Sequence, residues 1–110
     1  MSVLHRDLAA GRWSKLPFIE QMANIASEVE RTLSWRLKKN PAYSERAFER
    51  ALELLDLTLA STENRMRLKE LARLRETMVD YFAGENEYSS TEESWRRYFS
   101  AFTYAARRKY

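Results

Sequence analysis

The sequence of 110 residues contains no cysteine, two glycines, two prolines and a single histidine, His5. Without cysteine the chain forms no disulfide, no thiolate zinc site, no iron–sulfur cluster and no cysteine nucleophile. One histidine excludes a multi-histidine metal site, and two glycines provide no glycine-rich loop for nucleotide phosphates. We therefore expect no cofactor and no metal, and an enzyme is the class of protein that the sequence supports least.

The sequence also lacks long apolar runs and a large excess of one charge. No segment approaches the ~20 apolar residues that span a bilayer, and residues 1–12 lack the apolar core of a signal peptide. Nineteen basic and sixteen acidic residues give a net charge of +3, which is small for a dedicated DNA-binding domain. We expect one compact cytoplasmic domain with no membrane partner.

Helical periodicity dominates what the sequence does contain. Apolar residues recur every three or four positions in four segments, which places them on one face of an α-helix. The segments span 17–39, from Pro41 or Ser44 to about residue 60, 63–83, and from Ser90 or Thr91 toward the C-terminus. No segment alternates apolar and polar residues as a half-buried strand does. The sequence therefore predicts an all-α fold.

Residues with strong conformational preferences mark the ends of these segments. Asn40-Pro41 predicts a break, because the residue before proline avoids the helical region. Gly84 stands where a helix-capping glycine belongs, and the run Ser90-Thr91-Glu92-Glu93 fits a capping box with a glutamate at the third helical position. The short links favour an up-and-down antiparallel four-helix bundle over residues 17–110, preceded by an N-terminal arm or short extra helix over residues 1–16.

Three strings, FIEQMANIASEVER, YSERAFERALELLDLTL and RLKELARLRETMVDYFAGENEY, resemble a family of short uncharacterised bacterial all-helical proteins. The resemblance covers most of the chain from Phe18 onward. It implies no activity, cofactor or site residue. It supports the expectation that the chain is a complete small protein rather than a fragment.

Several apolar residues fall outside the apolar stripes and predict an interaction surface. Trp35 lies on the polar face of the first segment, four residues after Arg31, whose guanidinium can stack on the indole. The alternative for Trp35 is packing under the connection at residues 40–44 or under the arm. Because tryptophan is enriched in binding hot spots, the first hypothesis is a protein-interaction or structural bundle that forms a homo-oligomer or binds a protein partner. The surface comprises Trp13, Arg31, Trp35, Leu57 and Tyr104.

Basic residues gather at one end of the expected bundle. In an up-and-down arrangement the start of the third helix and the C-terminus share a pole, which contains Arg65, Arg67, Arg107, Arg108 and Lys109. Such a basic pole fits nucleic-acid phosphates, whose binding falls steeply with salt. A nucleic-acid-associated accessory protein is therefore the alternative function. The other interpretation is that these cations complement a helix dipole and are otherwise solvated.

Arg75 is a charged residue near the middle of an apolar stripe, between Leu71 and Val79. A buried charge must be paired, so Arg75 either forms an ion pair with a carboxylate on another helix or receives an anionic ligand. A salt-bridge lattice is expected between an acidic row on the second helix and a basic row on the third, namely Glu45, Glu49, Glu53 and Asp56 facing Arg65, Lys69 and Arg73. We interpret the acidic row as surface pairs rather than as a metal site.

Overall fold

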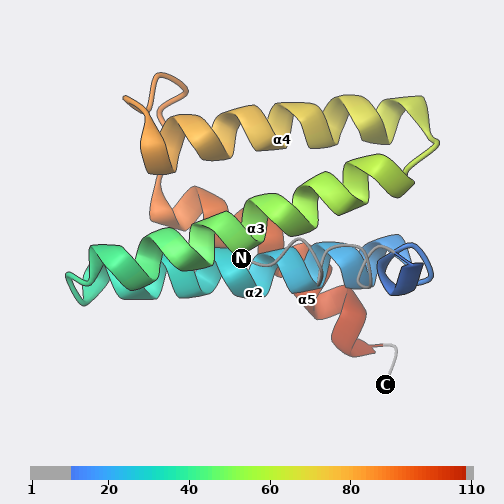
Figure 1. Ribbon diagram of the computed structural model, residues 1–110, viewed down its shortest axis with the longest axis horizontal. Coiled ribbons are helices and arrows are strands. Elements are labelled where there is room, and N and C mark those ends of the chain that lie inside the picture. The colour runs from blue at the N-terminus through green and yellow to red at the C-terminus, as the bar shows by residue number, and fades with distance from the viewer. Residues whose placement is uncertain (1–10, 109–110) are drawn as a thin grey trace.

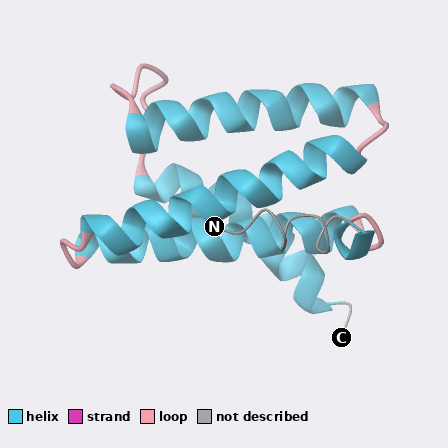
Figure 2. Ribbon diagram, viewed as in Figure 1, coloured by secondary structure: helices cyan, strands magenta, loops and turns pink. Residues whose placement is uncertain are grey.

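The computed structural model describes residues 11–108, and all regular structure in this range is helical (Figure 2). Residues 11–13 are helical and are followed by α2 (Phe18–Leu37), α3 (Pro41–Ser61), α4 (Arg65–Ala83) and α5 (Glu92–Arg108). The predicted all-α class is confirmed for the described range. His5, Lys109 and residues 1–10 of the predicted arm lie outside it. Among the described helices, none combines the length and apolar character that crossing a bilayer requires.

Each helix runs opposite to the helix that precedes it in the sequence (Figure 1). α2 packs along both α3 and α5, whereas α4 packs on α3. α5 crosses α2 obliquely rather than lying parallel to it (Figure 1). The start of α2, the end of α3, the start of α4 and the end of α5 therefore lie at one end of the molecule, which places residues distant in sequence beside one another.

The junction between α2 and α3 is built from local hydrogen bonds. Lys39 adopts a left-handed conformation with φ of 58°, and the backbone N–H groups of Lys39 and Asn40 donate to the carbonyls of Arg36 and Trp35 at 3.0 and 2.9 Å. This pattern is a Schellman motif, which ends α2. The Asn40 side chain then accepts from the backbone N–H of Tyr43 at 3.1 Å and caps α3.

The predicted break at Asn40-Pro41 is therefore correct, and α3 begins at Pro41 rather than at Ser44. Proline suits the first helical position because its missing N–H has no partner there in any helix. Ser44 is buried instead, and its hydroxyl donates to the carbonyl of Thr32 at 3.0 Å. That bond ties the first turn of α3 to α2.

The loop between α4 and α5 is held by side chains at both ends. The Asp80 carboxylate accepts the backbone N–H groups of Glu87 and Tyr88 at 2.7 and 3.1 Å. Gly84 caps α4, as the sequence predicts, with φ of −115° and thus outside the left-handed region common for capping glycines. The positive φ angles of this loop belong to Asn86 and Ser89.

The capping box of α5 is present with a different partner from the predicted one. The Thr91 hydroxyl oxygen accepts from the Ser94 backbone N–H at 3.0 Å, and the Ser94 hydroxyl oxygen accepts from the Thr91 N–H at 2.9 Å. Ser94 thus takes the place expected for a glutamate. Both glutamates that precede it are free to pair elsewhere, and each does so with an arginine one turn later in α5.

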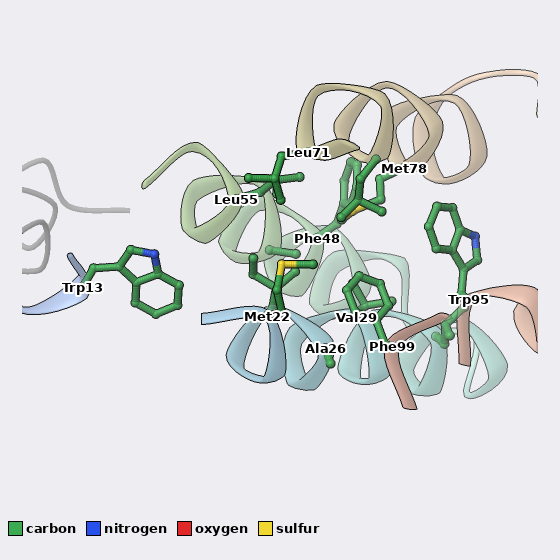
Figure 3. Close-up of a cluster of buried hydrophobic side chains, with 14 residues drawn as sticks. Trp13, Met22, Ala26, Val29, Phe48, Leu55, Leu71, Met78, Trp95 and Phe99 are labelled. Carbon is green, nitrogen blue, oxygen red and sulfur yellow. The ribbon is translucent and has the colours of Figure 1, made fainter. Parts of the chain in front are cut away.

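One buried cluster joins the four helices and the segment that precedes them. α2 contributes Met22, Ile25, Val29 and Leu33, spaced by three and four residues, and burial of each stabilises the fold by about 1.5–3 kcal/mol. Figure 3 shows Trp13 at one end of the cluster and Trp95 at the other. The remaining buried members are Ala26, Phe48, Ala51, Leu55, Leu71, Leu74, Met78 and Phe99.

Trp13 belongs to this core and not to an exposed surface, which corrects the sequence prediction. Only 7% of the residue is exposed, and the Gln21 side-chain amide donates to its carbonyl at 2.8 Å. Leu16 also packs against the cluster. Residues 13–16, assigned from the sequence to an arm, are thus part of the packed structure. Leu57 is likewise half-buried against the core rather than directed away from it.

Candidate functional site

The exposed face of α2 lies between α5 on one side and α3 on the other, and a depression runs along each side. The α2–α5 groove has a volume of about 640 Å³. Its lining consists of arginines, hydroxyl residues and two aromatic rings, with one carboxylate: Ala26, Ser27, Glu30, Arg31, Arg96, Phe99, Ser100, Thr103, Tyr104 and Arg107. The sequence candidates Arg31, Tyr104 and Arg107 therefore meet in one groove.

The α2–α3 hollow is smaller, about 150 Å³, and lies at the end of α2 near its junction with α3. Its lining residues are Arg31, Trp35, Tyr43, Arg46, Ala47 and Arg50. Arg31 borders both depressions, so the groove and the hollow are neighbours on a single face. We call this the α2 face.

The charge of the groove is set by one strong ion pair and one unpaired arginine. Arg96 donates to both carboxylate oxygens of Glu30, from Nε at 3.0 Å and Nη2 at 2.9 Å, and from Nη1 to Glu92 at 3.0 Å. These bonds hold the pKa of the Glu30 carboxyl below its usual value, so it stays ionised and cancels the Arg96 charge. Arg107 has no carboxylate partner among the described residues and leaves the groove positive.

Hydroxyl groups in the groove are already engaged with their own helices. Ser27, Ser100 and Thr103 each donate to a backbone carbonyl one turn earlier, at 3.0 to 3.3 Å. The guanidinium donors left for a ligand are those of Arg107, which is unpaired, and the N–H groups of Arg31 that its bond to Glu28 does not use. Guanidinium groups suit phosphate and carboxylate, because their N–H groups form a planar fork that binds two oxygens.

The hollow combines two aromatic rings with a surplus of cations. Trp35 and Tyr43 meet edge to face, with centroids 4.8 Å apart and planes at 85°. Lys38 Nζ lies 5.0 Å from the Trp35 ring centroid, and the Arg46 guanidinium lies 5.4 Å from that of Tyr43. The expected stacking of Arg31 on Trp35 is replaced by the Lys38 contact, because Arg31 instead binds Glu28 at 3.2 Å.

Trp35 is half-buried, and its contact with Tyr43 supports the alternative that it packs beneath the connection at residues 40–44. Tyr104 is 65% exposed, with the Arg108 guanidinium 5.6 Å from its ring centroid. The predicted interaction surface is therefore reduced to Arg31, part of Trp35 and Tyr104.

Arg75 forms an ion pair at the edge of the core. Its Nε donates to Asp56 Oδ1 at 2.8 Å and its Nη2 to Oδ2 at 3.4 Å, linking α4 to α3. These bonds raise the pKa of Arg75. The Arg75 side chain is 39% exposed, so it reaches the rim rather than remaining buried. The ion-pair alternative is the one the structure supports.

The predicted salt-bridge lattice between α3 and α4 is wrong. Within the described residues, the Arg75–Asp56 pair is the ion pair that joins these helices, and no ion pair links the acidic row to the basic row. The reason is geometric. A row of side chains on one helix reaches a row on the next helix only when both rows flank the line along which the two helices pack.

No group of three or more acidic or histidine residues in the described range could hold a metal ion.

The basic pole is assembled in part. The start of α4 and the end of α5 lie at the same end of the molecule (Figure 1). The Arg67 guanidinium, however, lies 4.2 Å from the ring centroid of Phe18, and Phe18 packs edge to face on Phe102 at 6.1 Å. Arg67 thus helps to join α4, α2 and α5. Arg65, Arg107 and Arg108 are exposed.

Sequence reasoning missed Tyr43, Arg46, Arg50 and Arg96 as site residues. A signal for the first three was present, because spacings of i, i+3 and i+7 place them on one strip of α3. Arg96 offered no such signal, since its Glu30 partner is 66 residues away.

Comparison with known proteins adds no relative: no protein-family model, no curated protein and no solved structure matches this chain.

Proposed function

We propose that the protein is a non-enzymatic four-helix bundle that binds nucleic acid by its phosphates along the α2 face. The observation that carries this proposal is the unpaired Arg107 facing Arg31 across the α2–α5 groove. Arg46 extends the positive charge beyond the groove, because it too lacks a carboxylate partner among the described residues. Proteins that bind phosphates sequence-independently use such arrays of exposed arginine.

The proposal is tested by measuring the affinity for a fluorescein-labelled oligonucleotide by anisotropy over a range of salt concentrations. The variant Arg31→Ala with Arg107→Ala removes two of the three arginines that line the groove and leaves the Arg96–Glu30 ion pair in place. The matched control is Lys69→Ala with Arg73→Ala, which removes two exposed cations from α4. Each lost phosphate contact lowers the slope of log affinity against log salt by about 0.7–0.9, so the groove variant should lose about 1.5.

Equal salt slopes for the wild type and the groove variant would contradict the proposal. A comparable loss in the α4 control would show that binding follows net charge and not the α2 face. Circular dichroism of each variant confirms that the fold is retained.

Self-association is the second candidate function, favoured by exposed apolar residues at the α2–α3 junction. Leu37 is 63% exposed and Tyr43 is 44% exposed, and the Tyr43 ring contacts the half-buried Trp35. In a homo-oligomer these side chains would bury one another across a two-fold contact. Light scattering coupled to size exclusion tests this candidate, because Leu37→Ser should lower the mass of an oligomer to that of the 13.1 kDa chain. A wild-type protein already of that mass would exclude it.

A further inference from the structure

Tyr43 is an aromatic ring held in a fixed orientation at the surface. Its edge-to-face contact with Trp35 restrains the ring, and 44% of the residue is exposed. The backbone N–H of Tyr43 is bonded to the Asn40 side chain, which fixes its place in the first turn of α3. A ring that is both restrained and accessible loses little entropy when a second flat group stacks on it.

The surroundings of this ring are cationic on two helices. Arg46 lies over the Tyr43 ring, and Arg31 and Arg50 line the same hollow. Glu28 lies on the α2 side, 3.2 Å from Arg31 and 4.0 Å from Arg50. Glu28 thus pairs with two of the three arginines, Arg46 forms no ion pair with a described residue, and Lys38 over Trp35 adds a further positive charge.

An aromatic ring flanked by arginines fits an unpaired nucleotide. The flat base stacks on the ring, and the guanidinium groups bind the phosphates on either side. In a duplex both faces of a base are covered by its neighbours, so the ring of Tyr43 has nothing to stack on. A hollow of about 150 Å³ also suits one planar group rather than the width of a double helix.

We infer that the α2 face binds single-stranded nucleic acid, with an unpaired base stacked on Tyr43 and its neighbouring phosphates on Arg31, Arg46 and Arg50. This inference rests on the proposed function and specifies the form of nucleic acid that the site selects. Trp35 acts as a positioning residue, because it holds the Tyr43 ring in place.

The test compares three probes of similar charge: a single-stranded oligonucleotide, a duplex of the same length and inorganic polyphosphate. Tyr43→Ala removes the stacking ring, and Tyr43→Phe retains it without the hydroxyl. Base stacking on an aromatic residue changes affinity by about 5- to 150-fold. Tyr43→Ala should therefore weaken single-strand binding by that factor and leave the other two probes unchanged, while Tyr43→Phe should bind all three as the wild type does.

Tryptophan fluorescence provides a readout that does not depend on affinity. Trp13 and Trp95 are 7% and 4% exposed, whereas Trp35 is half-buried beside Tyr43. Saturation with the single strand should therefore quench Trp35, and Trp35→Phe should abolish most of the quenching. Glu28→Gln should strengthen binding of all three probes, because it removes the negative charge beside Arg31 and Arg50.

Three results would overturn the inference in different ways. If Tyr43→Ala binds the single strand as well as the wild type while the Arg31 and Arg107 variant is weakened, stacking is wrong and the proposed function stands. If the wild type binds neither the single strand nor the duplex at low salt, both the inference and the proposed function are wrong. Equal weakening of polyphosphate by Tyr43→Ala would also overturn the inference, since polyphosphate has no base.

Discussion

The indole N–H of Trp13 donates a hydrogen bond of 2.9 Å to Oγ1 of Thr58, a residue with no exposed surface. The Thr58 hydroxyl in turn donates to the carbonyl of Leu54 at 2.8 Å. Thr58 thus uses its hydroxyl as donor and acceptor at once, and it joins the segment before α2 to the last turns of α3. Buried polar groups require such partners, because an unpaired one costs more than a bond contributes.

Replacing Thr58 with valine should destabilise the protein by about 1–3 kcal/mol, because the Trp13 N–H then stays buried without an acceptor. The matched control is Thr77→Val, since the Thr77 hydroxyl bonds only to the Arg73 carbonyl of its own helix. Urea unfolding measures both. Trp13→Phe in the valine background should recover part of the loss, and a valine variant as stable as the control would show that the Trp13 bond contributes nothing.

The Arg75–Asp56 pair should contribute at most about 1 kcal/mol, because both side chains are partly exposed, at 39% and 53%. We expect Arg75→Met and Asp56→Asn each to lower the free energy of unfolding slightly. A double-mutant cycle isolates the interaction between them. A loss of several kcal/mol for Asp56→Asn alone would mean that Arg75 behaves as a buried charge.

Gly84→Ala should destabilise the protein by about 1–2 kcal/mol through steric overlap. A Cβ at this position would lie 3.0 Å from the carbonyl oxygen of Asp80 and 3.2 Å from its Cα, and backbone atoms of a helix cannot move aside cheaply. Gly11→Ala is the control, because its Cβ meets nothing within 4 Å. That helical position should gain about 0.5–1 kcal/mol. Thermal unfolding shows whether each variant is less or more stable than the wild type.

The Glu30–Arg96 pair should make stability depend on acidity in a defined direction. The bonds from Arg96 lower the pKa of folded Glu30 below the ordinary 4.5, so the pair stabilises the fold above that pH. The contribution disappears as the pH falls through the lowered value. The free energy of unfolding of the wild type should therefore exceed that of Glu30→Gln at neutral pH. The difference should be at most about 1 kcal/mol, because the side chains of Glu30 and Arg96 are both about half exposed.

Urea unfolding of the wild type and Glu30→Gln from neutral pH down to acid measures this difference. The difference in free energy of unfolding between the two proteins should be constant above about pH 5 and should decrease to zero below it. A gap that persists in acid would show that the glutamine variant loses packing rather than an ion pair.

Local sequence signals determined the helices and most of their ends. The three- and four-residue spacing from Met22 to Leu33 predicted the buried face of α2, and Asn40-Pro41 predicted the break that follows it. Such signals act over one or two helical turns, so they can be recognised in the sequence without knowing which helices pack against the segment. Cap details were less predictable, because Ser94 takes the place of a glutamate at the start of α5, and the positive φ angles after α4 belong to Asn86 and Ser89 rather than to the capping Gly84.

The sequence by itself also identified Trp35 as unusual on a polar face, with Arg31 one turn before it. Only the tertiary structure decided that Trp13 is core, that Arg75 pairs with Asp56, and that Arg96 neutralises Glu30 from 66 residues away. It also decided that Arg31 borders two depressions, because their walls come from α3 and α5. Periodicity specifies which face a residue occupies on its own helix. The neighbour opposite that face follows from helix order and tilt, which depend on how all the buried side chains pack together.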